Sequence, residues 1–133
     1  PTDGDFHILA SSIDGMDAAL AAASQRGYLP VAASDQENAE TIENLPGGLG
    51  FISLSLILTE KRSLRPLALD GIVASSETIA AGTYPITKTF YLVTGPAVSD
   101  LAIDFIGFVS SPAGIDILRR TGHADIAIEF AQR

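Results

Sequence analysis

The stretch TYPITKTFYLVTGP, residues 83–96, constrains the fold of this chain more than any other part of the sequence. Pro85 has a locked φ and also restricts the backbone of Tyr84, so the chain enters the following segment in a defined direction. Residues 88–94 are rich in β-branched and aromatic side chains, which favour a strand. A Gly-Pro pair ends this segment, and Ser99 then caps a helix. The stretch therefore predicts a strand that leads directly into a helix.

Short strand candidates alternate with helix candidates along the rest of the chain. The predicted strands are 29–32, 50–54, 65–70 and 88–94, and the third ends in an Asp-Gly turn. The predicted helices are two short ones within 6–24, followed by 35–44, 55–61, 77–81, 101–109 and 113–120. Because strands that alternate with helices over short loops are typical of α/β proteins, we expect an α/β fold, a three-layer sandwich with a mixed, mostly parallel sheet.

Side-chain caps indicate where these helices begin. The Ser34 hydroxyl can accept from the N–H of Glu37, whose carboxylate can reach back, so the pair predicts a capping box. Asp14 is the predicted cap of the second short helix. Further caps are predicted at Ser75 or Ser76, at Ser99 and at Ser111, where Pro112 suits a first turn.

Composition and charge exclude several classes of protein. The chain has 133 residues, of which 47% are hydrophobic and 18% charged, which fits one globular domain with its own core. Its net charge of −8 disfavours nucleic acid and anionic membranes as partners. The absence of cysteine excludes disulfides, thiol catalysis and zinc–thiolate sites.

No catalytic or metal-binding pattern is present in the sequence. His7 and His123 lie far apart and show no metal-ligand spacing. Residues 47–50 are rich in glycine, but no lysine follows them and a strand, rather than a helix, is predicted next. We interpret these glycines as a tight entry into the sheet. We therefore expect no enzyme activity, no metal and no cofactor.

Four segments in order resemble the C-terminal half of phosphate-type substrate-binding proteins of ABC transporters. They are PGGLGFISLS (46–55), RPLALDGI (65–72), AGTYPITKTFYLVTGP (81–96) and FIGFVSSPAGIDILRRTGH (105–123). Each segment alone is weak, whereas the four together, in the order and spacing of the family, are specific. The resemblance covers about residues 46–123.

The resemblance implies a periplasmic-binding-protein-like lobe of type II that binds a small solute, including a phosphate-like anion, and delivers it to an ABC permease. Residues 1–133 would form a single α/β lobe, with the second ligand-binding lobe in about 1–97 and C-terminal helices and a tail in about 98–133. An N-terminal lobe of the same protein would complete the cleft. We expect a piece of a longer protein that is periplasmic or extracytoplasmic, with a lipid anchor on the full-length form. An isolated lobe would also be able to form a homodimer through the exposed surface.

The predicted ligand-binding residues are Thr2, Asp3, Gly4 and Asp5. Phosphate binders of the family carry Arg-x-x-x-Ser-Gly-Thr at the corresponding helix start, and here Asp5 falls near the Ser-Gly-Thr position. Because a carboxylate repels a phosphate dianion, we expect a different solute, one that offers a donor or a cationic group. Alternatively, Asp3 and Asp5 merely cap the first helix.

Two other functions use the same architecture. A ligand-sensing regulatory domain would bind an effector with the same lobe, and an upstream DNA-binding or signalling domain would favour it. An enzyme that has borrowed the fold would need an acid/base pair in the cleft, and the sequence indicates none.

Overall fold

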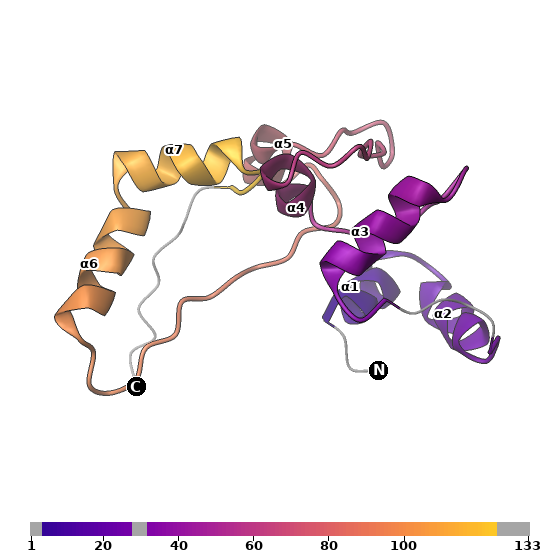
Figure 1. Ribbon diagram of the computed structural model, residues 1–133, viewed down its shortest axis with the longest axis horizontal. Coiled ribbons are helices and arrows are strands. Elements are labelled where there is room, and N and C mark those ends of the chain that lie inside the picture. The colour runs from indigo at the N-terminus through magenta and orange to yellow at the C-terminus, as the bar shows by residue number, and fades with distance from the viewer. Residues whose placement is uncertain (1–3, 28–31, 125–133) are drawn as a thin grey trace.

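The computed structural model describes residues 4–27 and 32–124, and the regular elements of these residues are helices (Figure 1). They are α1 (Gly4–Ser12), α2 (Met16–Ser24), α3 (Asp35–Asn44), α4 (Leu54–Thr59), α5 (Ser76–Ala80), α6 (Asp100–Val109) and α7 (Pro112–Arg120). Helices α1 to α3 lie at one end of the molecule, α4 and α5 lie in the middle, and α6 and α7 form an arm at the other end (Figure 1).

The predicted α/β sandwich with a mostly parallel sheet is wrong. Within 4–27 and 32–124 the β-structure is limited to an isolated bridge between Leu69 and Ile72. This bridge closes the predicted Asp-Gly turn, where Asp70 and Gly71 both have positive φ, of 51° and 80°. Positive φ at both central residues is typical of a type I′ turn. The predicted strand 29–32 lies mostly outside the described residues.

The other strand candidates have extended backbones without a neighbouring strand. Residues 88–94 run along the surface between α5 and α6 as the long connection visible in Figure 1. Residues 50–53 contact α3 and no strand: the Asn38 side chain of α3 donates a hydrogen bond to the Phe51 carbonyl oxygen at 2.8 Å. The prediction failed because β-propensity measures how well a side chain suits a pleated surface and does not provide a strand to pair with.

The helices, by contrast, begin close to where the sequence places them. Ser34, Ser75, Ser99 and Ser111 each accept a hydrogen bond from a backbone N–H in the first turn of the helix that follows. The carboxylate of Glu37 reaches back one residue further than predicted, to the N–H of Ala33 at 2.7 Å. These four capping predictions are confirmed, and side-chain capping explains the agreement because it depends only on neighbours in sequence.

Two helix starts differ from the prediction. α2 is preceded by Gly15, with φ of 75° and no side-chain cap, so the predicted Asp14 cap is wrong. Glycine adopts this left-handed conformation without a steric penalty. Ser53, which was assigned to a strand, caps α4 by accepting from the N–H of Leu56.

The glycines of residues 47–50 bring the chain back against α3. A side chain at Gly50 would collide with the Ile42 side chain, and one at Gly48 would lie 2.8 Å from the Ile42 carbonyl oxygen. These glycines therefore permit a close approach, as predicted. The surface approached is α3 and not the edge of a sheet, so that part of the prediction is wrong.

Helices α6 and α7 meet at a corner of 62°. A Cβ atom at Gly114 would lie 2.5 Å from the Val109 carbonyl oxygen and closer still to that of Phe108. Gly114 also donates its N–H to Ser111, the cap of α7, at 3.2 Å. The Ser-Pro-x-Gly sequence at 111–114 thus combines a cap, a first-turn proline and the space that lets α7 start against the end of α6.

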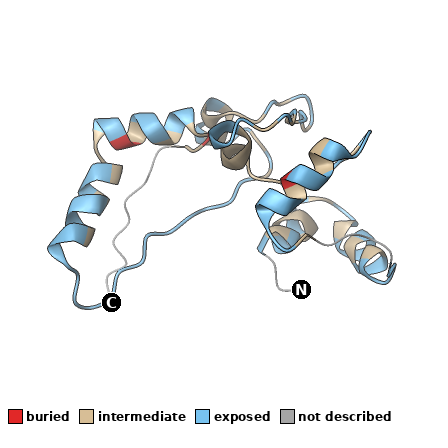
Figure 2. Cartoon of the chain, viewed as in Figure 1, coloured by how far each residue is buried: buried red, intermediate tan, exposed pale blue. Residues whose placement is uncertain are grey.

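Little side-chain surface is buried by this arrangement. Among the described residues the only hydrophobic side chain in the buried class is Ala39, on α3. Figure 2 shows the helices mostly in the colours of intermediate and exposed residues. Apolar burial is the main stabilising term in folding, so this part of the chain is held largely by local hydrogen bonds.

In the described part of the chain, no single helix is long and apolar enough to cross a membrane. The bent pair of α6 and α7 meets the length and composition criteria only when the two helices are taken together.

The corner at Gly114 yields a stability prediction. Gly114→Ala should lower the free energy of unfolding by about 1–3 kcal/mol, because the methyl group would overlap α6 carbonyl oxygens. Gly107→Ala is the matched control: it lies within α6, a Cβ there meets nothing within 4 Å, and it should stabilise by up to about 1 kcal/mol. Thermal unfolding followed by circular dichroism at 222 nm measures both variants. Equal melting temperatures would contradict the close contact at the corner.

Candidate functional site

The described part of the predicted site is joined to a lysine far along the chain. Asp5 lies in the first turn of α1, and its Oδ1 atom is 2.5 Å from Nζ of Lys88. The Asp5 side chain is 26% exposed and that of Lys88 is 46% exposed. Nζ of Lys88 also lies 5.9 Å from the centre of the Phe90 ring, within the range of a cation–π interaction. We call Gly4, Asp5 and Lys88 the α1 site.

The Lys88 side chain passes close to Gly4. A Cβ atom at Gly4 would meet Nζ and Cε of Lys88 at 3.7 and 3.9 Å, which is ordinary van der Waals contact. Thr2 and Asp3, the other predicted ligand-binding residues, lie outside the described residues. The structure thus brings two of the four predicted residues together with one that the sequence analysis missed.

The sequence contains a feature that could have identified Lys88 as a functional residue. Lys88 is the only charged residue between Thr83 and Ser99. Lys88 falls at the start of the predicted strand 88–94, and no ligand-binding role is predicted for it from the sequence. A single cation in an otherwise uncharged apolar stretch indicates a local anionic partner, and in this structure Asp5 is such a partner.

The ion pair changes the electrostatics of the α1 site. Considered alone, the negative charge of Asp5 disfavours a phosphate dianion. The adjacent ammonium group of Lys88 balances this charge, and its three N–H donors suit oxyanions. The carboxylate therefore no longer presents an unbalanced negative charge to an approaching anion.

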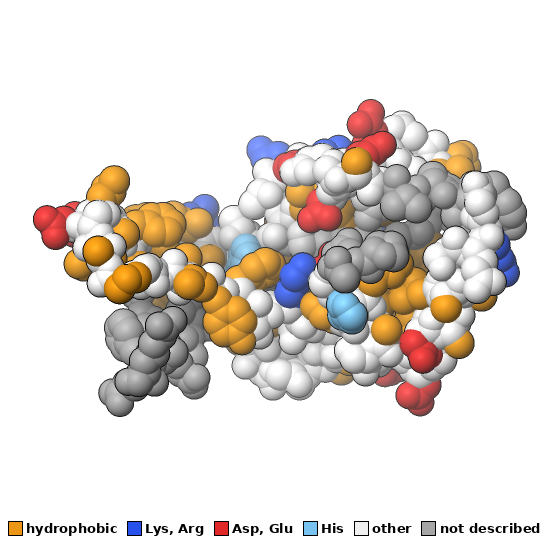
Figure 3. Space-filling model, turned by 90° about the horizontal axis from the view of Figure 1, so that it is seen from below, with side chains coloured by type: hydrophobic (Ala, Val, Ile, Leu, Met, Phe, Trp, Pro, Cys, Tyr) orange, Lys and Arg blue, Asp and Glu red, His pale blue; other side chains and the backbone are white. Residues whose placement is uncertain are grey.

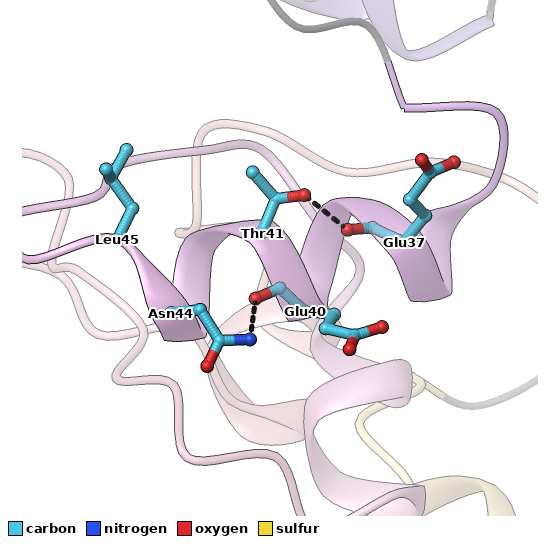
Figure 4. Close-up of a pocket in the computed structure, with 5 residues that line it drawn as sticks. All are labelled: Glu37, Glu40, Thr41, Asn44 and Leu45. Atoms are coloured by element: carbon cyan, nitrogen blue, oxygen red, sulfur yellow. Dashed lines mark hydrogen bonds between the residues drawn. The ribbon is translucent and has the colours of Figure 1, made fainter.

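A shallow concavity of about 480 Å³ lies along α3 (Figure 4). Its lining consists of Glu37, Glu40, Thr41, Asn44 and Leu45. The Thr41 hydroxyl and the Asn44 amide donate to carbonyl oxygens one turn earlier, each at 2.8 Å (Figure 4). This surface presents the carboxylates of Glu37 and Glu40, and the nearby Thr41 and Asn44 side chains donate to carbonyl oxygens of α3 itself. It is therefore unsuited to an anion.

A smaller depression of about 280 Å³ lies where α5 meets the end of α7. Its lining residues are Ser76, Glu77 and Ala80 of α5, Arg119 of α7, and His123 and Ala124, which follow α7. The Ser76 hydroxyl donates to the Arg119 carbonyl oxygen at 2.5 Å and so joins the two helices. Phe90 packs edge-on against His123, with ring centres 6.2 Å apart. The depression contains groups of both charge signs, so its charges do not select one class of ligand.

Glu77 in this depression has a perturbed acidity. The nearby Ser75 hydroxyl and, to a smaller extent, the backbone N–H of Glu77 itself favour the ionised carboxylate and lower the pKa of Glu77 below its ordinary value of 4.5. Hydrogen bonds to the ionised form favour that form. The group is exposed, and the same serine caps α5, so a structural role accounts for this shift.

A second charged cluster joins α3 to the end of α4. The Arg62 guanidinium lies 2.6 Å from a Glu60 oxygen and 3.3 Å from a Glu43 oxygen. These carboxylates, Glu60 first, raise the pKa of Arg62. Glu43 also accepts from the Ser63 N–H at 2.7 Å. Because these ion pairs join α3 to the segment after α4, we assign the cluster a structural role: it holds the two segments together.

The histidines lie apart in the structure as in the sequence. His7 belongs to α1, whereas the Nδ1 atom of His123 is 3.1 Å from the Thr121 hydroxyl at the end of α7. Within the ranges that the structure covers, no three His, Asp or Glu side chains are grouped closely enough to hold a metal ion.

Comparisons with known proteins point to a class of binding proteins. The chain is similar to phosphate-binding proteins over part of its length. These are the proteins named phosphate-binding protein PstS 2 in two strains of Streptococcus pneumoniae, each 31% identical over 77 residues. The matched part is 58% of this chain, and it spans about a quarter, 25%, of the length of those relatives. No model of a protein family matches the chain. No solved structure matches it.

The Ser75 hydrogen bond yields a testable pKa change. Ser75→Ala should raise the pKa of Glu77 toward 4.5, because the main donor to the carboxylate is lost. Because the folded-state pKa is lowered, the carboxylate contributes stability that is fully present above its ordinary pKa and is lost as the pH falls below that value through the folded-state pKa. An NMR titration of the Glu77 side chain measures the change, with Ser76→Ala as the control. An unchanged titration midpoint in Ser75→Ala would contradict the assignment.

Proposed function

We propose that this chain is part of the solute-binding component of an ABC transporter and that its ligand is phosphate or a similar oxyanion. The observation that carries the proposal is the 31% identity over 77 residues with proteins named for phosphate binding. Such a component works outside the cytoplasm, where a lipid anchor can hold it, and it delivers its ligand to an ABC permease. It binds and releases the ligand without chemical change.

The α1 site supports an oxyanion as the ligand. Lys88 provides a cation that is nearly half exposed, at the start of α1, where backbone N–H groups point outward. Gly4 lies beside Lys88 and adds no side chain of its own to the site. Asp5 holds the lysine in position, and Thr2 and Asp3 are the further candidates from the sequence pattern.

The remaining ligand contacts come, in this proposal, from other segments of the protein. The chain spans about a quarter of the length of the relatives, so a complete binding protein of that kind has further residues to enclose the ligand. Small-ligand sites generally bury most of the ligand surface between converging walls. The α1 site alone is open, and it supplies one wall.

The two rival functions receive less support. A regulatory sensor would bind an effector by the same contacts, but the matching relatives are named as phosphate-binding proteins and not as regulators. An enzyme would need a converging acid/base pair, and the lowered pKa of Glu77, which lines the smaller depression, is explained by its contact with the serine that caps α5.

Isothermal titration of the full-length protein with phosphate, and with sulfate as a comparison oxyanion, tests the proposal. We expect one phosphate per chain, and we expect Lys88→Gln to weaken binding by about tenfold or more, since hydrogen bonds to charged groups contribute roughly 1.5–3 kcal/mol. Lys61→Gln, which changes the other lysine of the chain, is the matched control and should bind normally.

The Asp5→Asn variant distinguishes between two ligand classes: phosphate, and a solute that offers a donor or a cationic group, as predicted from the sequence. Removing this carboxylate should strengthen the binding of phosphate, because a competing anion leaves Lys88. It should weaken the binding of a solute that presents a donor or cation to Asp5. No heat with millimolar phosphate would contradict the function, whereas phosphate binding that is insensitive to Lys88→Gln would contradict only the α1 site.

A further inference from the structure

Side chains from three segments of the chain lie in a row at the α1 site. Nζ of Lys88, which pairs with Asp5, lies 5.9 Å from the centre of the Phe90 ring. That ring meets the His123 ring edge-on, with centres 6.2 Å apart and an angle of 63° between the two planes. These four residues, which we call the contact row, connect the first turn of α1 with the residues that follow α7.

The extended backbone of this connection places Lys88 and Phe90 on the same side. Side chains of an extended segment alternate between two sides, so residues two positions apart share one of them. The exposed fractions follow this alternation. Phe90 and Leu92 are 66% and 59% exposed, whereas Tyr91 and Val93 are 80% and 88% exposed. The side that carries the lysine and the phenylalanine therefore faces the rest of the molecule more than the other side does.

Side chains, and not backbone hydrogen bonds, fix the path of this connection. Between Thr89 and Val98 no backbone N–H or C=O group makes a hydrogen bond to another described residue. The ring of His123 is itself tied to the end of α7, because its Nδ1 atom is 3.1 Å from the Thr121 hydroxyl. The contact row thus sets the position from which the Lys88 side chain reaches α1.

Phe90 and Asp5 hold the lysine by different physical means. The carboxylate attracts the ammonium group and also cancels its charge. The face of an aromatic ring attracts a cation through the ring quadrupole, although the ring carries no net charge. The ring therefore restrains the Lys88 side chain and leaves its positive charge available to an oxyanion. Because a lysine side chain has many rotamers, a lysine that is held in place beforehand loses less entropy when a ligand binds.

The placement of this one ammonium group matters because other cations are not gathered around it. Basic side chains are scattered over the face of the molecule in Figure 3 and form no cluster there. Lys88 is the cation of the α1 site as we define it, and it is nearly half exposed. An anion at this site therefore depends on where a single flexible side chain is held.

We propose that Phe90 is a positioning residue of the α1 site: its ring, supported by His123, holds the Lys88 ammonium group where it can bind an oxyanion. This inference rests on the proposed function, because the oxyanion is the ligand proposed for that site. Phe90 acts through Lys88, and His123 acts through Phe90. Neither residue belongs to the sequence pattern from which the site was predicted.

NMR of the full-length protein without ligand tests whether Phe90 holds Lys88. Protons above the face of an aromatic ring are shifted upfield by its ring current, so the Cε protons of Lys88 should be shifted upfield. The shift should disappear in Phe90→Leu and remain in Phe90→Tyr, which keeps the ring. Tyr91→Leu is the matched control: it removes the neighbouring ring on the other side of the segment and should leave the lysine signal unchanged.

Isothermal titration of the same proteins with phosphate tests the positioning role. Phe90→Leu should weaken phosphate binding by about two- to fivefold, the effect of losing one exposed cation–π contact. Phe90→Tyr and Tyr91→Leu should bind as the wild type does. His123→Ala should weaken binding in the same direction as Phe90→Leu and by a smaller factor, because it removes only the support of the ring.

The two measurements separate this inference from the proposed function. A Lys88 signal that is the same in the wild type and in Phe90→Leu would overturn the contact. Equal phosphate affinities of these two proteins would overturn the positioning role, and so would a loss of affinity that Phe90→Tyr shares. A wild-type protein that binds no phosphate would contradict the proposed function, and the NMR shifts would then decide the contact between Phe90 and Lys88 by themselves.

Discussion

The serine side-chain cap is the interaction on which the described structure most depends. Each of the helices α3 to α7 begins after a serine whose hydroxyl accepts a hydrogen bond from a backbone N–H in the first turn. A single cap contributes about 1 kcal/mol. In a chain with a large core, this contribution would be small compared with that of apolar burial. Here, where Ala39 is the only described hydrophobic side chain that is fully buried, local hydrogen bonds decide where the helices form.

The scarcity of buried side chains has a consequence for the rest of the molecule. A sequence that is 47% hydrophobic has enough apolar surface to fill a core. In the described residues much of that surface is exposed, above all at residues 90–93 and on α6. Apolar contacts beyond those made within the described residues would be needed to cover it.

The α1 site shows how one long-range ion pair changes a functional interpretation. Considered along the sequence, Asp5 is an isolated carboxylate that argues against an anionic ligand. In the structure, Lys88 lies beside it although 83 residues separate the two in sequence, and the balance of charge becomes compatible with the phosphate-binding relatives. The net charge at this site is therefore set by Asp5 and Lys88 together. It cannot be inferred from either residue type alone.

The sequence by itself determined where four of the helices begin and the Asp-Gly turn, because these depend on residues within a few positions of one another. Ser34, Ser75, Ser99 and Ser111 were predictable as caps for this reason. Strand pairing was not predictable in the same way. Residues 88–94 have the composition of a strand, but a ladder requires a second segment at hydrogen-bonding distance. Only the tertiary structure decided that no sheet forms among the described residues and that Asp5 meets Lys88, since both outcomes depend on segments distant in sequence.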